Sequence, residues 1–511
     1  MREFNTFGPV NPRQHYHVNR VAVKADLRAK IDKGRYLTLN AARQTGKTTL
    51  FREVVAEMEA TGDYFAILLD FGALRGFSGT RLYERLTVDL NGQAVRLGLP
   101  TPAPQRDHGD FLDWLRLCVA QRGQRGVLII DEFDAVQEDI LTNLLSLLRA
   151  MYLARYDPLY PALHSIILVG VRDLPSLLHG TQSPFNIADS FLLPYFTPAE
   201  VVDLLSQHTA ETGQPFATDV IEAITRETEG QPFLVNRLGQ LLTAEIVPER
   251  SRTIVKSDLA YALSLLLSEN NTHFASILSK AIPHRAVLLP MLLYGEQMSD
   301  FLAAETQDLL MYGVLRGVED TQHLRFARIA CPIYRKLLLM RLARPELDPP
   351  VNGSVANRYV TGGVLDFDRL LESFQAFMAE HGVRLLRSAA SGRPLEISGQ
   401  YLLLSYLSAV LSSVGGLVTI ESVSAAGEVD LLVFHQARRF IIETKIWQGL
   451  AAYVQGQAQL AAYVTAAGLE KGHLVVFDEQ LAANPLLGEH GPVFEQSVAN
   501  KQIRTYLVTA A

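Results

Sequence analysis

The chain has little cysteine: Cys118 and Cys331 are the only two in 511 residues. They are too few and too far apart to suggest a disulfide framework or a cysteine metal site, so a reducing compartment is expected. The amino terminus lacks the apolar segment of a secretory signal, and the longest apolar stretch, residues 401–411, is too short to cross a membrane. These absences predict a cytoplasmic protein without a membrane partner.

An excess of positive charge is also missing, because the net charge is −7. This argues against a protein that grips nucleic acid with its whole surface. The first 55 residues are locally basic. Either a solvated helix face or a nucleic-acid-binding patch would explain this charge. The length predicts three or four domains, and an apolar content of 48% with 20% charged residues predicts globular ones.

Residues 36–50 predict a strand, a tight loop and the start of a helix in immediate succession. The loop contains Gly46-Lys47-Thr48, and its backbone N–H groups, with the helix N-terminus, would hold the phosphates of ATP. Lys47 would reach the β- and γ-phosphates and Thr48 a Mg²⁺ ion. Ala41 stands where the usual motif has its first glycine, and an ordinary strand-to-helix loop is the alternative. The residues expected to bind nucleotide are Ala42, Arg43, Gln44, Thr45, Gly46, Lys47, Thr48 and Thr49.

Two further strands are expected to end in polar residues at the same edge of a parallel sheet. Residues 127–130 form an apolar run that ends in Asp131 and Glu132. Asp131 would hold Mg²⁺ through water and Glu132 would polarise the attacking water. The strand 165–170 precedes Arg172, which is a candidate phosphate sensor or a surface arginine paired with a neighbouring acid.

Five motifs together resemble the bacterial AAA-like ATPases near the STAND and archaeal-ATPase clades. They are Ala-Arg-Gln-Thr-Gly-Lys-Thr-Thr, Leu-Ile-Ile-Asp-Glu, Val-Gly-Val-Arg, Ser-Pro-Phe-Asn-Ile and Gly-Gln-Pro-Phe-Leu-Val-Asn. The resemblance implies a P-loop NTPase core with a doubly wound parallel sheet over residues 1–190, a helical lid over 191–265 and a winged helix over 266–347. It also implies that the turn ending in Pro232 lies beside the nucleotide. An arginine finger is not evident, so hydrolysis by an isolated subunit is in doubt. A homo-oligomer is one expected assembly. The winged helix would bind DNA or only pack against its neighbours.

A proline-rich linker is expected over residues 348–365, and a second domain over 366–511. Its central feature is a β-hairpin, residues 427–434 and 439–445, with a polar turn. Period-two geometry places Glu443 and Lys445 on one face, and the turn brings Asp430 close to them. Two carboxylates that converge among apolar residues are expected to share a Mg²⁺ ion. The alternative is a strand edge whose charges face solvent.

The order Asp430, Glu443, Lys445 and a following Gln459-x-x-x-Tyr463 resembles the PD-(D/E)XK nuclease superfamily. The resemblance implies a restriction-endonuclease-like α/β domain in which Asp430 and Glu443 hold the metal, and Lys445 and Gln459 assist catalysis. Glu396 or Gln400 stands where relatives often supply another acid. Residues 361–511 hold ten Lys and Arg against fourteen Asp and Glu, so DNA binding would depend on the ATPase half or on self-association.

The sequence therefore predicts an ATP-controlled, Mg²⁺-dependent DNA nuclease, with a role against foreign DNA as an analogy. Two alternatives stay open. One is an ATP-dependent signalling switch whose carboxy-terminal domain binds without cleaving. The other is a nuclease whose nucleotide site binds ATP without turnover.

Overall fold

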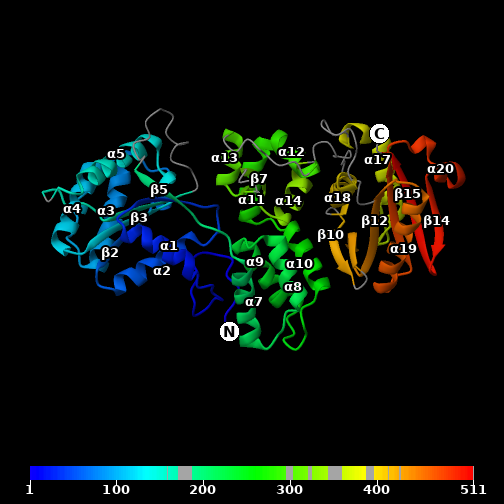
Figure 1. Ribbon diagram of the computed structural model, residues 1–511, viewed down its shortest axis with the longest axis horizontal. Helices are drawn as coiled ribbons and strands as arrows, with labels where there is room; N and C mark the ends of the chain where they lie inside the picture. The colour runs from blue at the N-terminus through cyan, green and yellow to red at the C-terminus, as the bar shows by residue number, and fades with distance from the viewer. Residues whose placement is uncertain are drawn as a thin grey trace.

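The computed structural model describes residues 1–157, 159–170, 187–294, 303–319, 325–342, 359–386, 396–411, 414–424 and 427–509. Figure 1 shows three parts side by side along the long axis: a sheet with helices, a central helical part and a second sheet with helices. Within these ranges, none of the helices combines the length and the apolarity that a membrane crossing needs.

The amino-terminal part is built on a five-stranded parallel sheet in the order β2-β3-β4-β1-β5. The predicted α/β class with a parallel sheet is confirmed. Strand β4 is buried along its whole length because helices cover both faces of the sheet. The strands are β1 (Tyr36–Asn40), β2 (Tyr64–Asp70), β3 (Arg125–Asp131), β4 (Ser165–Gly170) and β5 (Ala188–Leu192).

Two separate hydrophobic cores lie on the two faces of this sheet. Helices α1 and α2 supply Leu27 and Val54 to one core, and α3, α4 and α5 supply Leu90, Leu115 and Leu145 to the other. The sheet is therefore doubly wound. The helices are α1 (Val21–Asp32), α2 (Lys47–Ala60), α3 (Gly79–Leu97), α4 (His108–Arg122) and α5 (Glu138–Ala154), with short 3₁₀ turns η1 (Phe71–Leu74) and η2 (Phe133–Ala135).

The central part begins at a capping box. Thr197 Oγ1 accepts from Glu200 N (3.2 Å) and Glu200 Oε2 accepts from Thr197 N (2.8 Å), while Pro198 occupies the first helical turn. The helical elements that follow are α7 (Pro198–Thr212), α8 (Thr218–Thr228), α9 (Pro232–Gln240), η3 (Leu241–Ile246), α10 (Lys256–Ser268), α11 (Thr272–Ala281), η4 (Ile282–His284), α12 (Arg285–Tyr294) and α13 (Ala304–Met311).

The amino-terminal segment packs on these helices and not on the first sheet. Phe4, Tyr16 and Val18 are buried in one core with Val201 and Leu204 of α7. The sequence had placed residues 1–190 in a single ATPase core. The first residues differ from that expectation because their aromatic side chains fit between the lid helices.

A short antiparallel hairpin follows, as the winged-helix pattern predicts. Its strands are β6 (Leu315–Glu319) and β7 (Arg325–Ile329), and the helix α14 (Pro332–Leu342) comes after them. Part of the predicted linker is structured: residues 360–365 form a second hairpin of β8 (Val360–Thr361) and β9 (Val364–Leu365). Tyr359 and Leu365 are buried in the central core, which holds this end of the linker in place.

The carboxy-terminal part contains a six-stranded mixed sheet in the order β10-β11-β12-β13-β15-β14. The pairs β12–β13 and β13–β15 are parallel and the other pairs are antiparallel. Of its strands, only the hairpin β11–β12 follows from the sequence analysis. The elements are α17 (Phe367–Leu386), α18 (Glu396–Leu411), β10 (Gly416–Ser424), β11 (Gly427–His435), β12 (Arg438–Ile446), α19 (Leu450–Ala466), β13 (Lys471–Asp478), η5 (Leu481–Ala483), α20 (Pro485–His490), β14 (Val493–Val498) and β15 (Lys501–Thr509).

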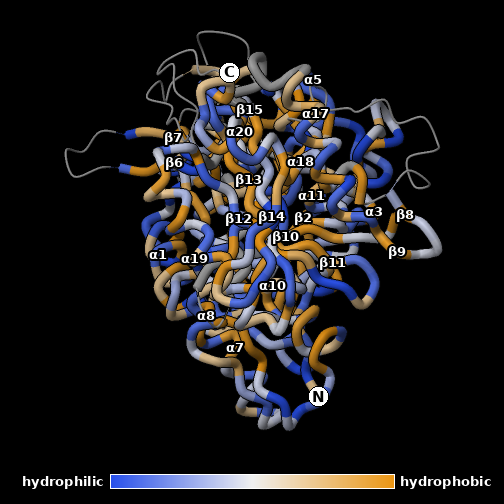
Figure 2. Tube along the Cα trace, turned by 90° about the vertical axis from the view of Figure 1, so that its right-hand side faces the viewer, coloured by the Kyte–Doolittle hydropathy of each residue, from blue (hydrophilic) through white to orange (hydrophobic). Residues whose placement is uncertain are grey.

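Helices cover both faces of the second sheet. Phe374 of α17 and Leu407 of α18 share a core with Ile442, whereas Leu460 of α19 and Leu486 of α20 share another with Ile441. Figure 2, which looks onto this end of the molecule, shows hydrophobic stretches along several of its strands.

The central helices and the second sheet are joined by one continuous core. Helix α10 lies along the edge strand β10, and the ring of Tyr261 on α10 is 5.8 Å from that of Phe434 on the next strand, β11. The second sheet is thus attached to the lid helices by packed side chains, in addition to the chain itself.

Candidate functional site

The loop between β1 and α2 turns sharply at two residues. Gln44 has φ +57° and Gly46 has φ +87°, and within the described chain Ala41 and Ala42 are absent from the residues with positive φ. Alanine therefore fits where the usual motif has glycine, since the left-handed backbone is needed elsewhere in the loop. Thr45 Oγ1 donates to Ala42 O (2.9 Å) and fixes the curve.

Lys47 lies inside this loop. Its Nζ donates to Ala41 O (2.8 Å) and Ala42 O (3.4 Å). Burial lowers the pKa of Lys47, and the nearby carboxylate of Asp131 opposes that shift. The Lys47 ammonium is partly desolvated and donates to two neutral carbonyls. It is therefore suited to bind a phosphate, whose negative charge would balance its positive charge.

Thr48 and Asp131 meet at the edge of the sheet although 83 residues separate them. Thr48 Oγ1 donates to Asp131 Oδ2 (3.1 Å), and Asp131 Oδ1 accepts from Glu132 N (3.0 Å). Burial raises the pKa of Asp131, and the Thr48 hydrogen bond opposes it. A hydroxyl beside a carboxylate is the oxygen pair that Mg²⁺ takes together with phosphate, so these residues fit an ATP-bound Mg²⁺ ion.

Glu132 directly follows and has an unusual backbone, with φ +48°. Its Oε2 forms an ion pair with Arg75 (3.0 Å), and about half of its side chain is exposed (49%). Arg75 follows the 3₁₀ turn after β2, where the sequence offers no motif. No sequence motif therefore indicates Arg75 as the partner that holds the Glu132 carboxylate beyond the end of β3.

A cavity of about 120 Å³ lies beside the loop, between three parts of the chain. Thr45 and Gly46 line it from the loop, and Pro232 and Phe233 line it from the lid. The amino-terminal segment completes the wall with Asn5, Thr6, Gly8, Val10, Tyr16, His17, Val18 and Arg20. The apolar and backbone groups of this wall suit the base and ribose of a nucleotide whose phosphates lie on the loop.

Three members of the predicted basic run are paired with acids. Lys24 pairs with Glu57 (2.6 Å) and Arg28 pairs with Asp32 (2.7 Å). Arg20 lies 3.5 Å from a carboxylate oxygen of Glu200 at the start of α7. Lys24 thus joins α1 to α2, and Arg20 joins the start of α1 to the lid, whereas the Arg28 pair lies within α1.

The lid touches the phosphate loop directly. Gln231 Nε2 donates to Gln44 O (3.4 Å), and Pro232 opens helix α9 immediately after it. Gly230 has φ +77°, and a Cβ there would lie 1.9 Å from Phe196 O. The turn can therefore be made only by glycine. Arg172 lies outside the described residues.

The winged-helix region also reaches the loop. Gly313 has φ +74°, and a Cβ there would lie 2.5 Å from Ala42 Cβ. Arg316 and Arg328, on the two hairpin strands, form ion pairs with Glu229 at 2.7 and 3.1 Å. The hairpin is thus clamped to the residue before the Gly230 turn, a contact that the sequence did not predict.

A second polar group lies in the carboxy-terminal sheet. Glu443 is buried (side chain 1% exposed), and its Oε1 is 2.9 Å from Lys445 Nζ on the same face of β12. Burying a carboxylate among apolar residues is costly without a charged partner. The sequence paired these residues, and the structure brings them together.

Asp430 stands on the neighbouring strand, one residue beyond the last β11–β12 ladder pair, Leu431–Ile442. Its Oδ2 accepts from Thr444 N (2.7 Å) and Thr444 Oγ1 (2.8 Å), which closes the end of the ladder. The backbone carbonyl of Asp430 accepts from Gln400 of α18 (3.3 Å). In ladder order Asp430 falls opposite Glu443, so both carboxylates belong to the same end of the hairpin. The Thr444 contact was not predicted.

Helix α19 covers this end of β12. A Cβ at Gly456 would lie 3.3 Å from Lys445 Cγ, so the lysine stem runs across the glycine. Gln459, one turn on, donates to Tyr463 Oη (2.7 Å), which engages its amide within the helix. The side chain of Glu396 lies outside the described part.

Among the described residues, no group of three or more His, Cys, Asp and Glu side chains is placed to hold a metal ion. Asp430 and Glu443 supply two carboxylates, and Mg²⁺ often takes only one or two and keeps several waters. The residues fit such an ion in kind but not a cage built by protein alone.

Two family models match the amino-terminal half. One, described as an AAA domain, matches residues 31–178, and one described as an AAA-like domain matches residues 116–250. A search of curated proteins found no match.

Several solved structures are similar. A Walker-type ATPase of Pyrococcus abyssi is 20% identical, with a TM-score of 0.47 over 66% of this chain and 99% of that chain. The ORC1 protein of Aeropyrum pernix, solved with DNA, is 15% identical (TM-score 0.34; 64% and 94% covered). The RuvB Holliday junction branch migration motor of Thermotoga maritima is 16% identical (TM-score 0.34; 61% and 92% covered).

The two matched ranges contain the phosphate loop, Asp131, Glu132 and the lid turn at Pro232, which are the residues that meet around the loop. The amino-terminal part of this chain, residues 31–250, is therefore an AAA-type P-loop ATPase domain.

Proposed function

We propose that this protein is an ATP-controlled, Mg²⁺-dependent nuclease that cuts DNA. The observation that carries the proposal is the buried ion pair of Glu443 and Lys445 with Asp430 at the same end of the hairpin. Asp430 and Glu443 would hold the Mg²⁺ ion, which supplies Lewis-acid assistance to phosphodiester hydrolysis. Lys445 would steady the charge that grows on the scissile phosphate. Gln459 is proposed to assist from α19.

The ATPase half supports control of this site through the central core. Lid residue Gln231 contacts the phosphate loop, and α10 of the same helical part lies along β10. Strand β10 pairs with β11, which carries Asp430. A lid that moves with nucleotide state would therefore shift a strand next to the proposed catalytic carboxylate. Assembly of several subunits would add the basic surface that the carboxy-terminal part lacks.

Lys445→Ala tests the proposal. Supercoiled plasmid is incubated with Mg²⁺ and with ATP, ADP or no nucleotide, and the linear and nicked products are measured. We expect the wild type to cut and Lys445→Ala to lose about 100-fold or more in rate. Lys501→Ala removes the same charge from β15, where Lys501 pairs with Glu470 (3.0 Å), and should cut normally. A wild type that never cuts would contradict the nuclease.

The rival function is a signalling switch whose carboxy-terminal part binds without cleavage. It is favoured by the closed Glu443–Lys445 pair and because no cluster of three or more His, Cys, Asp and Glu side chains in the described part is placed to hold a metal. This function predicts that the protein does not cut plasmid with ATP, with ADP or without nucleotide, and that it still binds plasmid or a protein partner. A defence role in the cytoplasm would suit either function.

A further inference from the structure

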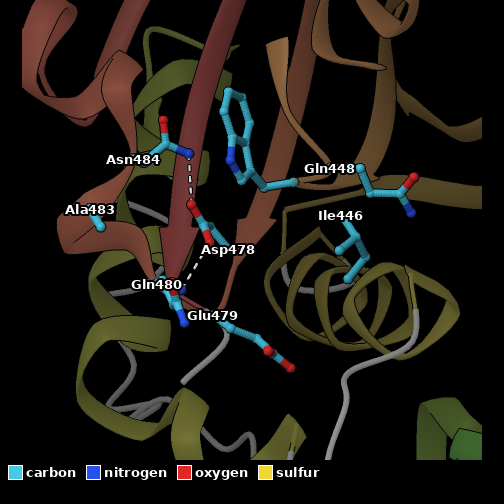
Figure 3. Close-up of a pocket in the computed structure, with 8 residues that line it drawn as sticks. Ile446, Gln448, Asp478, Glu479, Gln480, Ala483 and Asn484 are labelled. Atoms are coloured by element: carbon cyan, nitrogen blue, oxygen red, sulfur yellow. Dashed lines mark hydrogen bonds between the residues drawn. The ribbon is translucent and has the colours of Figure 1, made fainter. Parts of the chain in front are cut away.

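We propose that the cavity at the carboxyl ends of β12 and β13 binds one unpaired nucleobase next to the cut phosphodiester. This rests on the proposed nuclease function and adds a substrate class: DNA with a single-stranded or frayed segment at the cleavage site. The cavity holds about 420 Å³ and is lined by residues at the ends of both strands and by Ala483 and Asn484, which lie just before α20 (Figure 3).

The cavity lies beside the proposed catalytic group. Trp447 is two residues after Lys445, which is about 7 Å along an extended strand. Trp447 packs against the same α19-side core that contains Ile441, and its ring is 6.2 Å from that of Tyr453 on α19. The backbone N of Trp447 donates to Phe477 O of β13 (2.8 Å), which fixes the position of its backbone beside β13. The indole therefore belongs to the face of the sheet that carries Lys445.

The polar wall of the cavity is rigid. Asp478 is buried (6% exposed), and its two oxygens accept from Gln480 N (2.8 Å) and Asn484 Nδ2 (2.7 Å). Asn484 Oδ1 in turn accepts from Leu486 N (2.9 Å) at the start of α20. Figure 3 shows Asp478 joined to Asn484 and Gln480 by these bonds. Each carboxylate oxygen keeps a second acceptor position for a ligand.

The chemistry of the lining selects a base and not a phosphate. Asp478 and Glu479 give the lining negative charge, and it contains no Lys or Arg. A phosphate would be repelled, whereas an aromatic ring offers stacking to any base. Amides and carboxylates read base edges, and carboxylates accept from exocyclic amino groups. Bases with an amino group, adenine, cytosine and guanine, should therefore be preferred over thymine.

The pocket can be tested apart from cleavage. Labelled hexamers of dA, dC and dT, and a blunt duplex, are titrated into the full chain in EDTA, and binding is followed by fluorescence anisotropy. We expect dA and dC hexamers to bind more tightly than dT, and the duplex to bind weakly. Trp447→Ala should weaken hexamer binding about tenfold. Trp447→Phe, which keeps an aromatic face, should stay within about threefold of wild type, and the same thermal unfolding midpoint for Trp447→Ala and wild type excludes a folding defect as the cause.

Two matched charge variants and intrinsic fluorescence sharpen the result. Glu479→Gln, at the cavity, should reduce the preference for dA and dC over dT. Glu470→Gln makes the same change at an exposed residue before β13 (87% exposed) and should not. The chain has two tryptophans, and Trp114 is buried (4% exposed) in the ATPase part. Quenching by the hexamers should therefore disappear in Trp447→Phe.

Equal hexamer binding by wild type and Trp447→Ala would overturn the base pocket. So would quenching by free arginine or an arginine-rich peptide but not by hexamers, because the cavity would then take cations. If the hexamers bind as expected and plasmid is never cut with Mg²⁺, the base site stands and the nuclease fails. If plasmid is cut and the Trp447 variants change nothing, only the base site fails.

Discussion

Among single residues, Glu132 has a left-handed backbone and also a charged partner, Arg75, from the connection that follows β2. Positive φ at a glutamate costs of order 1 kcal/mol or more, so the fold pays to hold this carboxylate outside the end of β3. Its ion pair with Arg75 is half exposed and contributes little stability. The arrangement therefore fixes the position of the Glu132 carboxylate and adds little to the stability of the fold.

Glu132→Gln should therefore separate ATP binding from ATP turnover. The amide keeps the shape but cannot polarise the attacking water. We expect nucleotide affinity to stay within a few-fold and phosphate release to fall about 100-fold or more. Glu138→Gln, at the exposed start of α5, is the matched control. Unchanged release in Glu132→Gln would remove this residue from catalysis, and no release in the wild type would favour a site that only binds.

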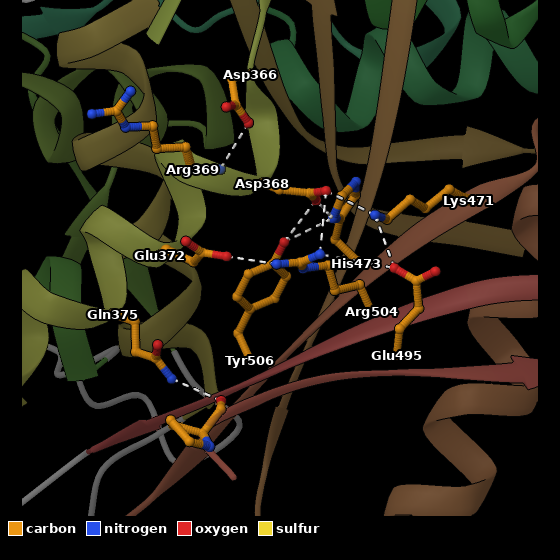
Figure 4. Close-up of polar contacts among 11 residues, drawn as sticks. Asp366, Asp368, Arg369, Glu372, Gln375, Lys471, His473, Glu495, Arg504 and Tyr506 are labelled. Atoms are coloured by element: carbon orange, nitrogen blue, oxygen red, sulfur yellow. Dashed lines mark hydrogen bonds and ion pairs between the residues drawn. The ribbon is translucent and has the colours of Figure 1, made fainter. Parts of the chain in front are cut away.

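His473 lies in a polar cluster between α17 and the second sheet (Figure 4). Asp368 Oδ1 is 3.5 Å from the His473 ring, and Lys471 and Arg504 are also close to Asp368. Burial lowers the pKa of His473 to about 3, so the folded protein keeps it neutral. The unfolded chain takes up this proton near pH 6.5. Stability from this residue is thus complete above pH 6.5 and is lost as the pH falls towards 3.

Between pH 7 and pH 5 this linkage is worth about 2 kcal/mol. Urea unfolding should show that the unfolding free energy of His473→Gln falls less between pH 7 and pH 5 than that of the wild type, by about 2 kcal/mol. Burial raises the pKa of Asp368, whereas the hydrogen bonds from Lys471 and Tyr506 and the charge of Lys471 lower it, and the net direction is down. The contribution of Asp368 is therefore lost only below its ordinary pKa of 3.8, outside the range between pH 7 and pH 5. Equal pH dependence in the two proteins would contradict a neutral buried imidazole.

At the scale of elements, the turn into helix α9 decides whether the lid meets the phosphate loop. Gly230→Ala places a methyl group against Phe196 O on a backbone with positive φ. We expect a loss of about 2 to 4 kcal/mol in unfolding free energy and weaker ATP binding. Gly213→Ala, which closes α7 at φ +78° with open space around it, should cost only about 1 kcal/mol. Equal losses would show that the Phe196 contact does not matter.

Buried strands were the elements that the sequence predicted well. The apolar runs of β1, β3 and β4 carry their own local signal. Strand β14 has none, because it is an edge strand with alternating half-buried residues. The linker prolines predicted a boundary, but residues 359–365 pack on the central core through contacts that composition does not reveal.

At the scale of the whole molecule, the winged-helix hairpin and the lid are joined at Glu229. Glu229→Gln removes the charge that Arg316 and Arg328 share and should loosen Gly313 from the phosphate loop. We expect faster release of a fluorescent ADP analogue, by about two- to tenfold, because a partly exposed pair is worth about 1 kcal/mol. Glu222→Gln, exposed on α8, should release it at the wild-type rate. Unchanged release in Glu229→Gln would mean that the hairpin does not close the site.

Motifs indicate candidate residues for the phosphate loop and for the proposed nuclease site, but not what surrounds them. Lys47, Thr48 and Asp131 follow from short patterns whose strand ends must meet. Arg75 reaches Glu132, and Gly313 reaches the phosphate loop, from distant parts of the chain, and only the folded arrangement brings them there. Thr444 lies between two predicted residues, yet its bond to Asp430 depends on where the ladder ends.

The most direct test of nucleotide control is the rate of plasmid cutting with Mg²⁺ in ATP, ADP and no nucleotide, for wild type and Lys47→Ala. The account predicts that the wild-type rate differs at least several-fold between nucleotide states. It also predicts that Lys47→Ala cuts at one rate in all three. A wild-type rate that ignores nucleotide, or a Lys47→Ala protein that still responds to ATP, would contradict it.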